Sequence, residues 1–258
     1  MKNLFNKLIK LVANKCSENN SEALFPTSPA AAQVQNELNA WTMTFALRRL
    51  SAQGFTFSTI LDVGASDGKW TKDVLTIFPE AQYLLFEPLA ERSRELELLR
   101  ESFSNVDFVL AAVGSAPGEV ELFVTEDLDG SRALLDHETN AANRKVPLVT
   151  IDHAIGARKL PPAYLLKLDV HGYELPILSG AAATLHQTRI VIIEAYNFHI
   201  TAASPTFVEL VLHMDKLGFY CIDIADPLRM SNEGFEWQVD LFFARKNDPA
   251  FAGKNLRF

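Results

Sequence analysis

Acidic residues stand at the ends of four otherwise apolar runs of the sequence: Asp62, Glu87, Asp169 and Glu194. A carboxylate without a partner is costly to bury among apolar side chains, so packing alone does not explain these residues. In open sheets of parallel strands, ligands bind outside the carboxyl ends of the strands. We therefore expect the four carboxylates to belong to one ligand-binding site.

A glycine-containing loop follows the first of these runs, in the segment ILDVGASDGKW. Asp62, Gly64 and Gly68 have the spacing Asp-x-Gly-x-x-x-Gly, which differs from the Gly-x-Gly-x-x-Gly pattern of dinucleotide-binding loops. An acidic strand end suits the positive groups of S-adenosylmethionine, and Gly64 lets the backbone lie against that cofactor. The loop alone also fits an ordinary strand-to-helix turn. Glu87, placed to accept hydrogen bonds from two ribose hydroxyls, favours S-adenosylmethionine.

Short apolar runs alternate with helix-like stretches beyond residue 54. The strand-like runs are 59–64, 81–88, 106–114, 164–170, 189–197, 219–224 and 238–245. The helix-like stretches are 70–78, 90–103 and 204–218, and the alternating pattern of 118–126 predicts a half-exposed hairpin strand. Several of the strand runs are continuously apolar, as strands buried on both faces are. The chain is therefore predicted to have an α/β fold, a mostly parallel sheet with helices on both faces.

The N-terminal part has a different pattern. Residues 1–12 repeat apolar side chains at helical spacing, 14–29 have the composition of a linker, and 29–53 are typical of a helix that stops at Gly54. We expect a helical extension and linker over 1–53 and the main domain over 54–258. The first helix is too short to span a membrane. It is expected to pack on the domain or on a partner subunit, with weak peripheral membrane contact as the alternative.

Composition narrows the class of protein. The 258 residues are 48% hydrophobic and carry a formal net charge of −8, which disfavours a broad nucleic-acid-binding surface. Cys16 and Cys221 are far apart and provide neither a disulfide framework nor a cysteine-based zinc site. The sequence therefore indicates a soluble protein of a reducing compartment, and the expected location is cytoplasmic.

The chain resembles the FkbM family of S-adenosylmethionine-dependent methyltransferases. The resemblance rests, in order, on ILDVGASDGKWT, LLFEP, LAAVGS, GSRALL, VTIDHAI, LLKLDVHGYELPILSGA and VIIEAYN, which span roughly residues 59–197. It implies a class I methyltransferase (Rossmann-like) fold: a mostly parallel seven-stranded sheet, with an extra β-hairpin and the N-terminal helical extension. It also implies methyl transfer to oxygen on a sugar, a glycosylated small molecule or a surface polysaccharide.

The resemblance further implies which residues contact the cofactor. The cofactor loop would consist of Asp62, Gly64, Ala65, Ser66 and Gly68. Glu87 would bind the ribose, and Ala111 and Ala112 would flank the adenine, with Asp107 as a polar candidate upstream. Asp169 would organise the methionine end of the cofactor or the loop.

Methyl transfer to a hydroxyl also needs a group that removes one proton. His171, in KLDVHGYE, is the first candidate for this base, and Asp169 and Glu174 are the carboxylate alternatives. A hydrogen-bonded structural role is an equally good interpretation of His171.

Three further residues are candidates for binding the acceptor: Glu194, Arg132 and His199. Glu194 could instead join Asp169 in holding a divalent cation. Two carboxylates at strand ends do not by themselves indicate a metal site, so no metal is assigned. Arg132 lies in an expected lid or acceptor loop, where it would meet an anionic acceptor or the cofactor carboxylate. A lipid, protein or other non-sugar acceptor and a non-catalytic cofactor-binding domain remain the alternatives.

Overall fold

A computed structural model describes residues 40–135, 142–202, 204–230 and 232–252. The chain divides into two units, Met1–Asn39 and Ala40–Phe258, and only the second is described. The helix expected at 1–12, the linker at 14–29 and the start of the helix expected at 29–53 therefore lie outside the described residues. None of the helices in the described part is both long and apolar enough to cross a membrane.

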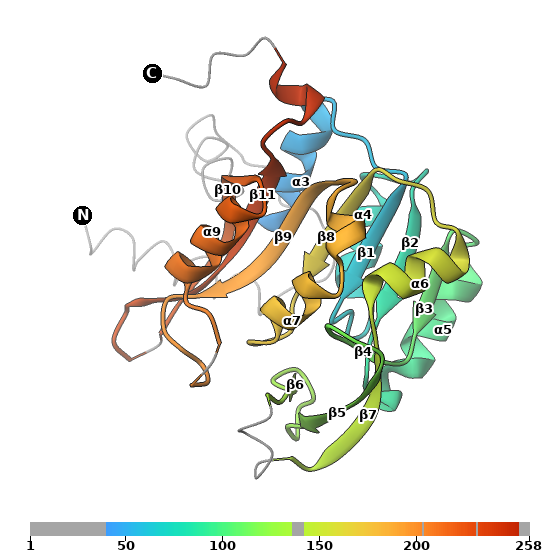
Figure 1. Cartoon of the computed structure of the whole chain (residues 1–258), viewed down its shortest axis with the longest axis vertical. Coiled ribbons are helices and arrows are strands. Elements are labelled where there is room, and N and C mark those ends of the chain that lie inside the picture. The colour runs from blue at the N-terminus through green and yellow to red at the C-terminus, as the bar shows by residue number, and fades with distance from the viewer. Residues whose placement is uncertain (1–39, 136–141, 203, 231, 253–258) are drawn as a thin grey trace, which may run out of the picture. The chain divides into compact units, whose positions relative to one another are not determined.

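A seven-stranded sheet is the centre of the described unit (Figure 1). Its strands are β1 Thr59–Val63, β2 Gln82–Phe86, β3 Val106–Val109, β8 Tyr164–Leu168, β9 Thr188–Tyr196, β10 Phe219–Arg229 and β11 Glu236–Arg245. The order across the sheet is β10-β11-β9-β8-β1-β2-β3. All neighbours from β9 to β3 are parallel, whereas β11 runs antiparallel to both β9 and β10. The predicted mostly parallel sheet is thus confirmed.

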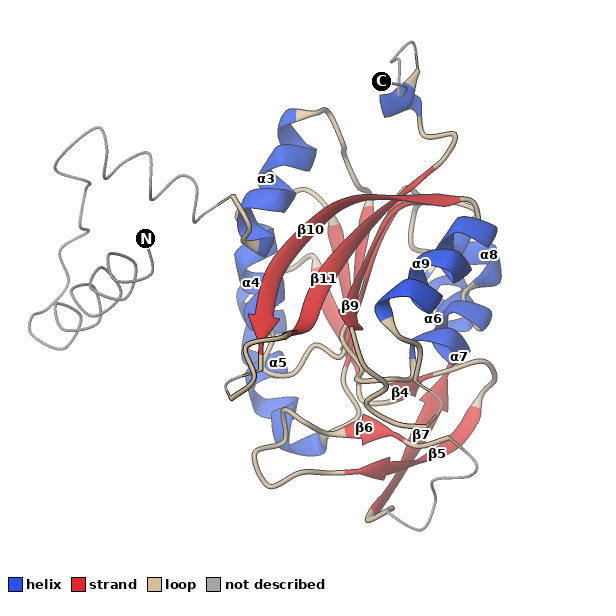
Figure 2. Cartoon of the chain, turned by 90° about the vertical axis from the view of Figure 1, so that its left-hand side faces the viewer, coloured by secondary structure: helices blue, strands red, loops and turns tan. Residues whose placement is uncertain are grey.

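Helices cover both faces of this sheet (Figure 2). They are α3 Met43–Ala52, α4 Lys69–Leu75, α5 Ser93–Ser102, α6 Ile151–Arg158, α7 Glu174–Ser179, α8 Ala182–Leu185 and α9 Phe207–Lys216, with the 3-10 turns η1 Ala90–Arg92 and η3 Pro249–Phe251. Helices α3, α4 and α5 lie on one face and α6 to α9 on the other. Successive residues of a central strand point into opposite cores. Ile60 packs in the core on the α3–α5 face and Leu61 in the core on the α6–α9 face, so the central strands are apolar on both faces.

A second, four-stranded sheet lies beside the carboxyl ends of the main strands (Figure 1). Its order is β4-β7-β5-β6, formed by β4 Ala112–Val113, β7 Arg144–Val149, β5 Gly118–Phe123 and β6 Arg132–Ala133. The hairpin strand expected at 118–126 is β5, which pairs antiparallel with β7. The prediction of one strand over 106–114 is wrong, because the chain leaves the main sheet after Val109 and joins the second sheet at Ala112. Both halves are apolar because each packs in a core, so the break has no signature in composition.

Helix α3 belongs to the packed core of the described unit. Met43, Ala46, Leu47 and Leu50 are buried in the core on the α4 face. Arg49 forms an ion pair of 2.6 Å with Asp223, which ties the helix to β10. The predicted domain boundary at residue 53 stays a prediction.

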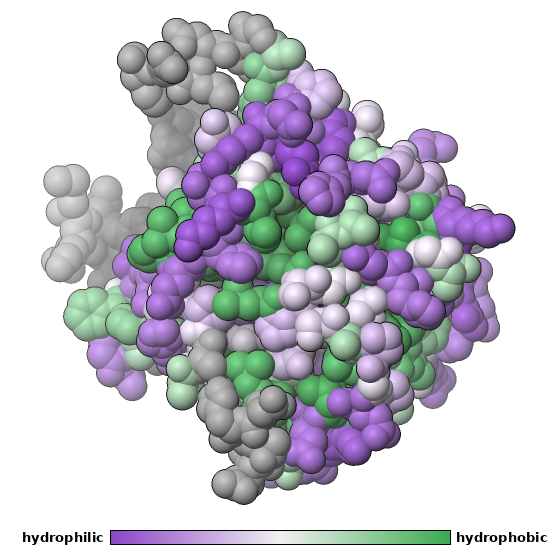
Figure 3. All heavy atoms as spheres, in the orientation of Figure 1, coloured by the Kyte–Doolittle hydropathy of each residue, from purple (hydrophilic) through white to green (hydrophobic). Residues whose placement is uncertain are grey.

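On the opposite face of the sheet, α9 presents a mixed outer surface. Hydrophobic and hydrophilic residues both reach the surface where this helix lies (Figure 3). Val208 and Leu212 are its exposed large hydrophobic residues, whereas Leu210 and Met214 are buried against the sheet. The helix therefore packs by one stripe, as expected for an amphipathic helix.

Candidate active site

The strand order of the main sheet reverses direction between β1 and β8, and the loops after these two strands touch. Gly64 has a φ of +80°, and a Cβ added to it would lie 2.0 Å from the carbonyl oxygen of Asp169. Only glycine fits such a close approach of two backbones. The Asp169 N–H donates to the Val63 carbonyl at 3.0 Å. A crevice at a point of strand-order reversal is the usual ligand site of open α/β sheets.

A cavity of about 320 Å³ opens at this point. Nine of the residues predicted to bind a ligand or act in catalysis line it: Gly64, Ser66, Glu87, Ala111, Ala112, Arg132, Asp169, His171 and Glu194. The loop around Asp129 closes one side, where the Asp129 carboxylate accepts from Arg92 at 2.5 Å and from the Ser66 hydroxyl at 3.4 Å. A volume of this size is within the usual range of small-molecule sites.

Glu87 is nearly buried at the end of β2, with 5% of its surface exposed. Its two carboxylate oxygens accept the N–H groups of Ser66, at 2.9 Å, and Leu89, at 2.8 Å. Burial raises the pKa of Glu87 to about 7, although both hydrogen bonds and Arg92 act to lower it. Each carboxylate oxygen has a further lone pair that can accept a hydrogen bond from a ligand in the cavity. The two backbone hydrogen bonds fix the position of the Glu87 side chain relative to the loop.

Asp62 lies beneath the loop and lines neither described cavity. It is completely buried, accepts from the Thr71 hydroxyl at 2.7 Å and faces the Lys167 ammonium at 3.6 Å. Burial raises its pKa, against the opposing effect of Lys167 and Thr71. Lys167, which sequence reasoning missed, also contacts Asp169 at 2.9 Å. The arrangement holds the β1 and β8 loops together, and a direct contact of Asp62 with a ligand stays a prediction.

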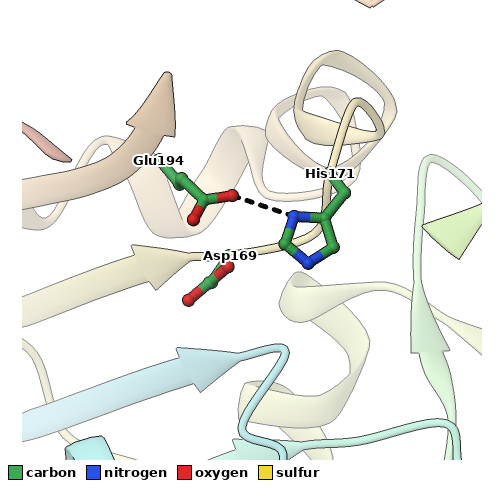
Figure 4. Close-up of side chains that lie close together, drawn as sticks. All are labelled: Asp169, His171 and Glu194. Atoms are coloured by element: carbon green, nitrogen blue, oxygen red, sulfur yellow. Dashed lines mark hydrogen bonds and ion pairs between the residues drawn. The ribbon is translucent and has the colours of Figure 1, made fainter. Parts of the chain in front are cut away.

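Asp169 and His171, in the loop after β8, converge with Glu194 of β9 (Figure 4). His171 Nδ1 lies 2.9 Å from Glu194 Oε2 and 2.8 Å from the Tyr196 hydroxyl, and its Nε2 lies 2.8 Å from the Asp129 carbonyl oxygen. Burial acts to lower the pKa of His171, but the hydrogen bond and charge of Glu194 outweigh it and raise that pKa to about 9. Burial would raise the pKa of Asp169, but Lys167 and His171 hold it below its usual value.

The hydrogen bonds of His171 affect whether it can act as the predicted general base. A carbonyl oxygen only accepts, so His171 Nε2 carries a proton, and with a pKa of about 9 the ring is positively charged at neutral pH. In this arrangement His171 does not accept a proton, so its predicted role as base requires these bonds to break. Glu174 is 2% exposed, accepts from the Gly172 N–H at 2.8 Å and lines neither cavity. Asp169 lines both cavities, although Lys167 occupies one of its oxygens.

The same three side chains have the composition of a metal site. One ligand atom from each of Asp169, His171 and Glu194 lies within 4.8 Å of the other two. Carboxylates and imidazole are donors for divalent transition metals. A cation bound there would have to replace the hydrogen bond that joins His171 to Glu194.

A second cavity, of about 490 Å³, adjoins the first on the α3 and α4 face of the sheet. The two cavities share Gly64, Ser66, Asp169 and Glu194 as lining residues. Ala65, predicted in the cofactor loop, lines the second cavity, as do Gln238 and Asp240 of β11. Gln238 donates to Glu194, which also accepts from Tyr196.

Three predicted residues lie elsewhere. Asp107 sits early in β3 and pairs with Arg158 at 2.9 Å, outside both cavities. The side chain of His199 is 54% exposed and its Nδ1 lies 2.7 Å from the Ser204 carbonyl oxygen, also outside both. Gly68, with a φ of +75°, is the residue before α4 and supports the turn of the loop. Their predicted roles in binding stay predictions.

Comparison with known proteins identifies a family. A sequence model of the methyltransferase FkbM domain matches residues 62–221. No curated protein sequence matches the chain. The methyltransferase FkbM of Methylobacillus flagellatus KT is similar in structure over 71% of this chain and 43% of its own, with 13% identity and a TM-score of 0.46. This chain therefore spans less than half the length of that relative.

A second solved structure is similar over a greater length. It is the 1,6-didemethyltoxoflavin-N1-methyltransferase of Burkholderia thailandensis with bound 1,6-didemethyltoxoflavin and S-adenosylhomocysteine, with 14% identity, a TM-score of 0.44, and coverage of 89% of this chain and 94% of that one. Likenesses of this strength carry no information on acceptor or residue roles. The family match covers more than half of the sequence, including the loop after β1 and the segment after β8. This chain therefore belongs to the FkbM methyltransferase family.

Proposed function

We propose that this protein transfers a methyl group from S-adenosylmethionine to an acceptor hydroxyl, on a sugar, a glycosylated small molecule or a surface polysaccharide. The observation that carries the proposal is the meeting of the Gly64 loop, Glu87 and Asp169 around one cavity at the strand-order reversal. Membership of the methyltransferase family supports the same reaction class.

The residues around the first cavity fit an adenosine and an amino acid. Glu87 has lone pairs for ribose hydroxyls, and the small Ala111 and Ala112 leave room for a flat base beside them. The loop at Gly64 and Ser66 brings backbone close to the cavity, and Asp169 offers a carboxylate to an ammonium. When bound, the cofactor supplies a methyl group on a sulfonium, which is open to in-line attack by an oxygen.

The protein's own contribution is placement and the exclusion of water. Lys167 keeps Asp169 ionised and fixed at the boundary of the two cavities. His171 ties the loop of Asp129 to Glu194, and so closes the first cavity on one side. Arg132, which also lines this cavity, is proposed to meet the carboxylate of the cofactor.

The cellular setting is part of the proposal. A small-molecule or carbohydrate acceptor, no nucleic-acid partner and a cytoplasmic location agree with the net charge of −8 and with two distant cysteines. A lipid, protein or non-sugar acceptor would use the same cofactor residues and is the second candidate.

Calorimetry with S-adenosylhomocysteine tests the cofactor site. We expect wild type to bind and Glu87→Ala to bind at least about tenfold more weakly, because hydrogen bonds to a charged group contribute roughly 1.5–3 kcal/mol. Glu95→Ala, the same change at an exposed position of α5, is the control and should bind as wild type does. Absence of binding by wild type would refute the proposed cofactor, and equal binding by Glu87→Ala would refute the role of Glu87.

A further inference from the structure

The second cavity has a wall of charged side chains at the edge of the main sheet. It lies between the start of α3, the first turns of α4, and strands β8, β9 and β11. Gly64, Ser66, Asp169 and Glu194 separate it from the first cavity. A molecule bound in the second cavity would therefore sit next to whatever occupies the loop at Gly64.

Negative charge predominates in this cavity. Its lining includes six acidic side chains, those of Asp67, Asp73, Asp169, Glu194, Asp226 and Asp240. Lys69 and Lys167 are the two lysines, and each already pairs with a carboxylate, Lys69 with Asp73 at 3.2 Å and Lys167 with Asp169 at 2.9 Å. The balance favours a ligand that donates hydrogen bonds or carries positive charge, and it repels an anion.

Asp240 is the carboxylate in this wall that is free to bind a ligand. It lies directly opposite Glu194 in the β11–β9 register, so both side chains point to the same face. Glu194 accepts from Gln238 and Tyr196, and Asp226 accepts from the Met43 N–H at 3.2 Å. Across residues 40–135, 142–202, 204–230 and 232–252, no donor is hydrogen-bonded to the carboxylate of Asp240.

Trp70 supplies an independent observation on the same cavity. Its indole Nε1 is buried and has no hydrogen-bond acceptor within the described part of the chain. The ring lines the cavity and packs against the Lys167 ammonium, 5.3 Å from its centroid. A buried N–H without an acceptor is rare and is satisfied when a polar ligand or water enters.

We propose that the second cavity binds the methyl acceptor, that Asp240 accepts a hydrogen bond from it, and that the acceptor is an uncharged or positively charged hydroxyl compound. This inference rests on the proposed function, because it places the acceptor beside the cofactor cavity. Burial raises the pKa of Asp240 to about 8, with Asp169 and Glu194 adding to the effect and Lys167 opposing it, so this group is mostly protonated at neutral pH while the cavity is empty. A cation bound against Asp240 lowers that pKa again and pairs with the ionised form. A donor or cation placed there would also offset the cost of burying the carboxylate.

Binding of three sugars that differ in charge tests the proposal. The probes are D-glucosamine, D-glucose and D-glucose 6-phosphate, each titrated into full-length protein saturated with S-adenosylhomocysteine. The indole N–H signal of Trp70 is followed by ¹H–¹⁵N NMR and assigned with Trp70→Phe. We expect glucosamine to bind at least about tenfold more tightly than glucose 6-phosphate, as one unit charge at ~6 Å and an effective dielectric constant of ~40 would give.

A charge-neutral variant and its control sharpen the result. Asp240→Asn should reduce the preference for glucosamine severalfold, whereas Asp215→Asn, at an exposed carboxylate of α9, should leave it unchanged. The inference is overturned if the order of affinities does not follow charge, if Asp240→Asn leaves that order unchanged, or if no probe shifts Trp70 up to its solubility limit. Failure of wild type to bind S-adenosylhomocysteine would instead refute the proposed function.

Discussion

Replacing His171 by asparagine should make the stability of this protein less dependent on pH. The ring joins β9 to the loop at Asp129, through Nδ1 to Glu194 and Nε2 to the Asp129 carbonyl oxygen. His171 has a φ of +55°, a conformation that asparagine tolerates better than most residues. The variant therefore removes the cation with little added backbone strain.

The magnitude follows from the pKa. The folded-state pKa of His171 is about 9 and its ordinary value is 6.5. A group whose pKa is raised by folding contributes stability that is fully present below its unfolded pKa and is lost as the pH rises through its folded pKa. The difference corresponds to about 3 kcal/mol, reduced somewhat by the partial exposure of the ring.

Urea unfolding of wild type and His171→Asn at about pH 6 and about pH 10 measures this contribution. We expect the variant to be less stable by about 3 kcal/mol at the lower pH and nearly equal to wild type at the higher pH. His199→Asn, at an exposed histidine, is the control and should show no such change. A stability difference that is the same at both pH values would refute the ion pair between His171 and Glu194.

Three further outcomes are expected. Gly64→Ala should abolish S-adenosylhomocysteine binding in calorimetry, because the φ of +80° disfavours alanine and the new Cβ would lie 2.0 Å from the Asp169 carbonyl oxygen. An unchanged affinity would contradict this close approach of the two loops. Lys167→Met should lower the free energy of unfolding by about 3–5 kcal/mol, since Asp62 and Asp169 lose their buried cation. A loss below about 1 kcal/mol would show that Lys167 is dispensable for stability. The affinity for S-adenosylhomocysteine should fall as the pH drops below about 7, because Glu87 then gains a proton and loses capacity to accept hydrogen bonds. A Glu87→Gln variant whose affinity has the same pH profile would show that Glu87 does not cause the fall.

The parallel part of the sheet could be predicted because it depends on patterns within the sequence. Continuous apolar runs indicate strands buried on both faces, and acidic residues at their ends indicate a ligand site at the carboxyl edge. Glu87, Asp169 and Glu194 do line one cavity. Asp62 stands at the same edge but turns into the core beneath the loop, since the side chains of a strand alternate between faces.

Other parts of the site depend on pairing that the sequence does not reveal. Asp240 lies in the first half of β11, and this half reaches the ligand edge only because β11 runs antiparallel to β9. Lys167 is hidden within an apolar run. Asp169 is only two residues away in the sequence, but the second carboxylate partner, Asp62, is brought to Lys167 by the pairing of β1 with β8 in the folded sheet. The Asp129 carbonyl oxygen that holds His171 is a backbone atom and leaves no trace in residue type.

A crystal structure of the protein with S-adenosylhomocysteine tests the central claim most directly. The account predicts the ligand in the first cavity, with its ribose hydroxyls within hydrogen-bond distance of Glu87 and its amino-acid end at the Gly64 loop beside Asp169. A ligand bound elsewhere, or a ribose that makes no contact with Glu87, would contradict it.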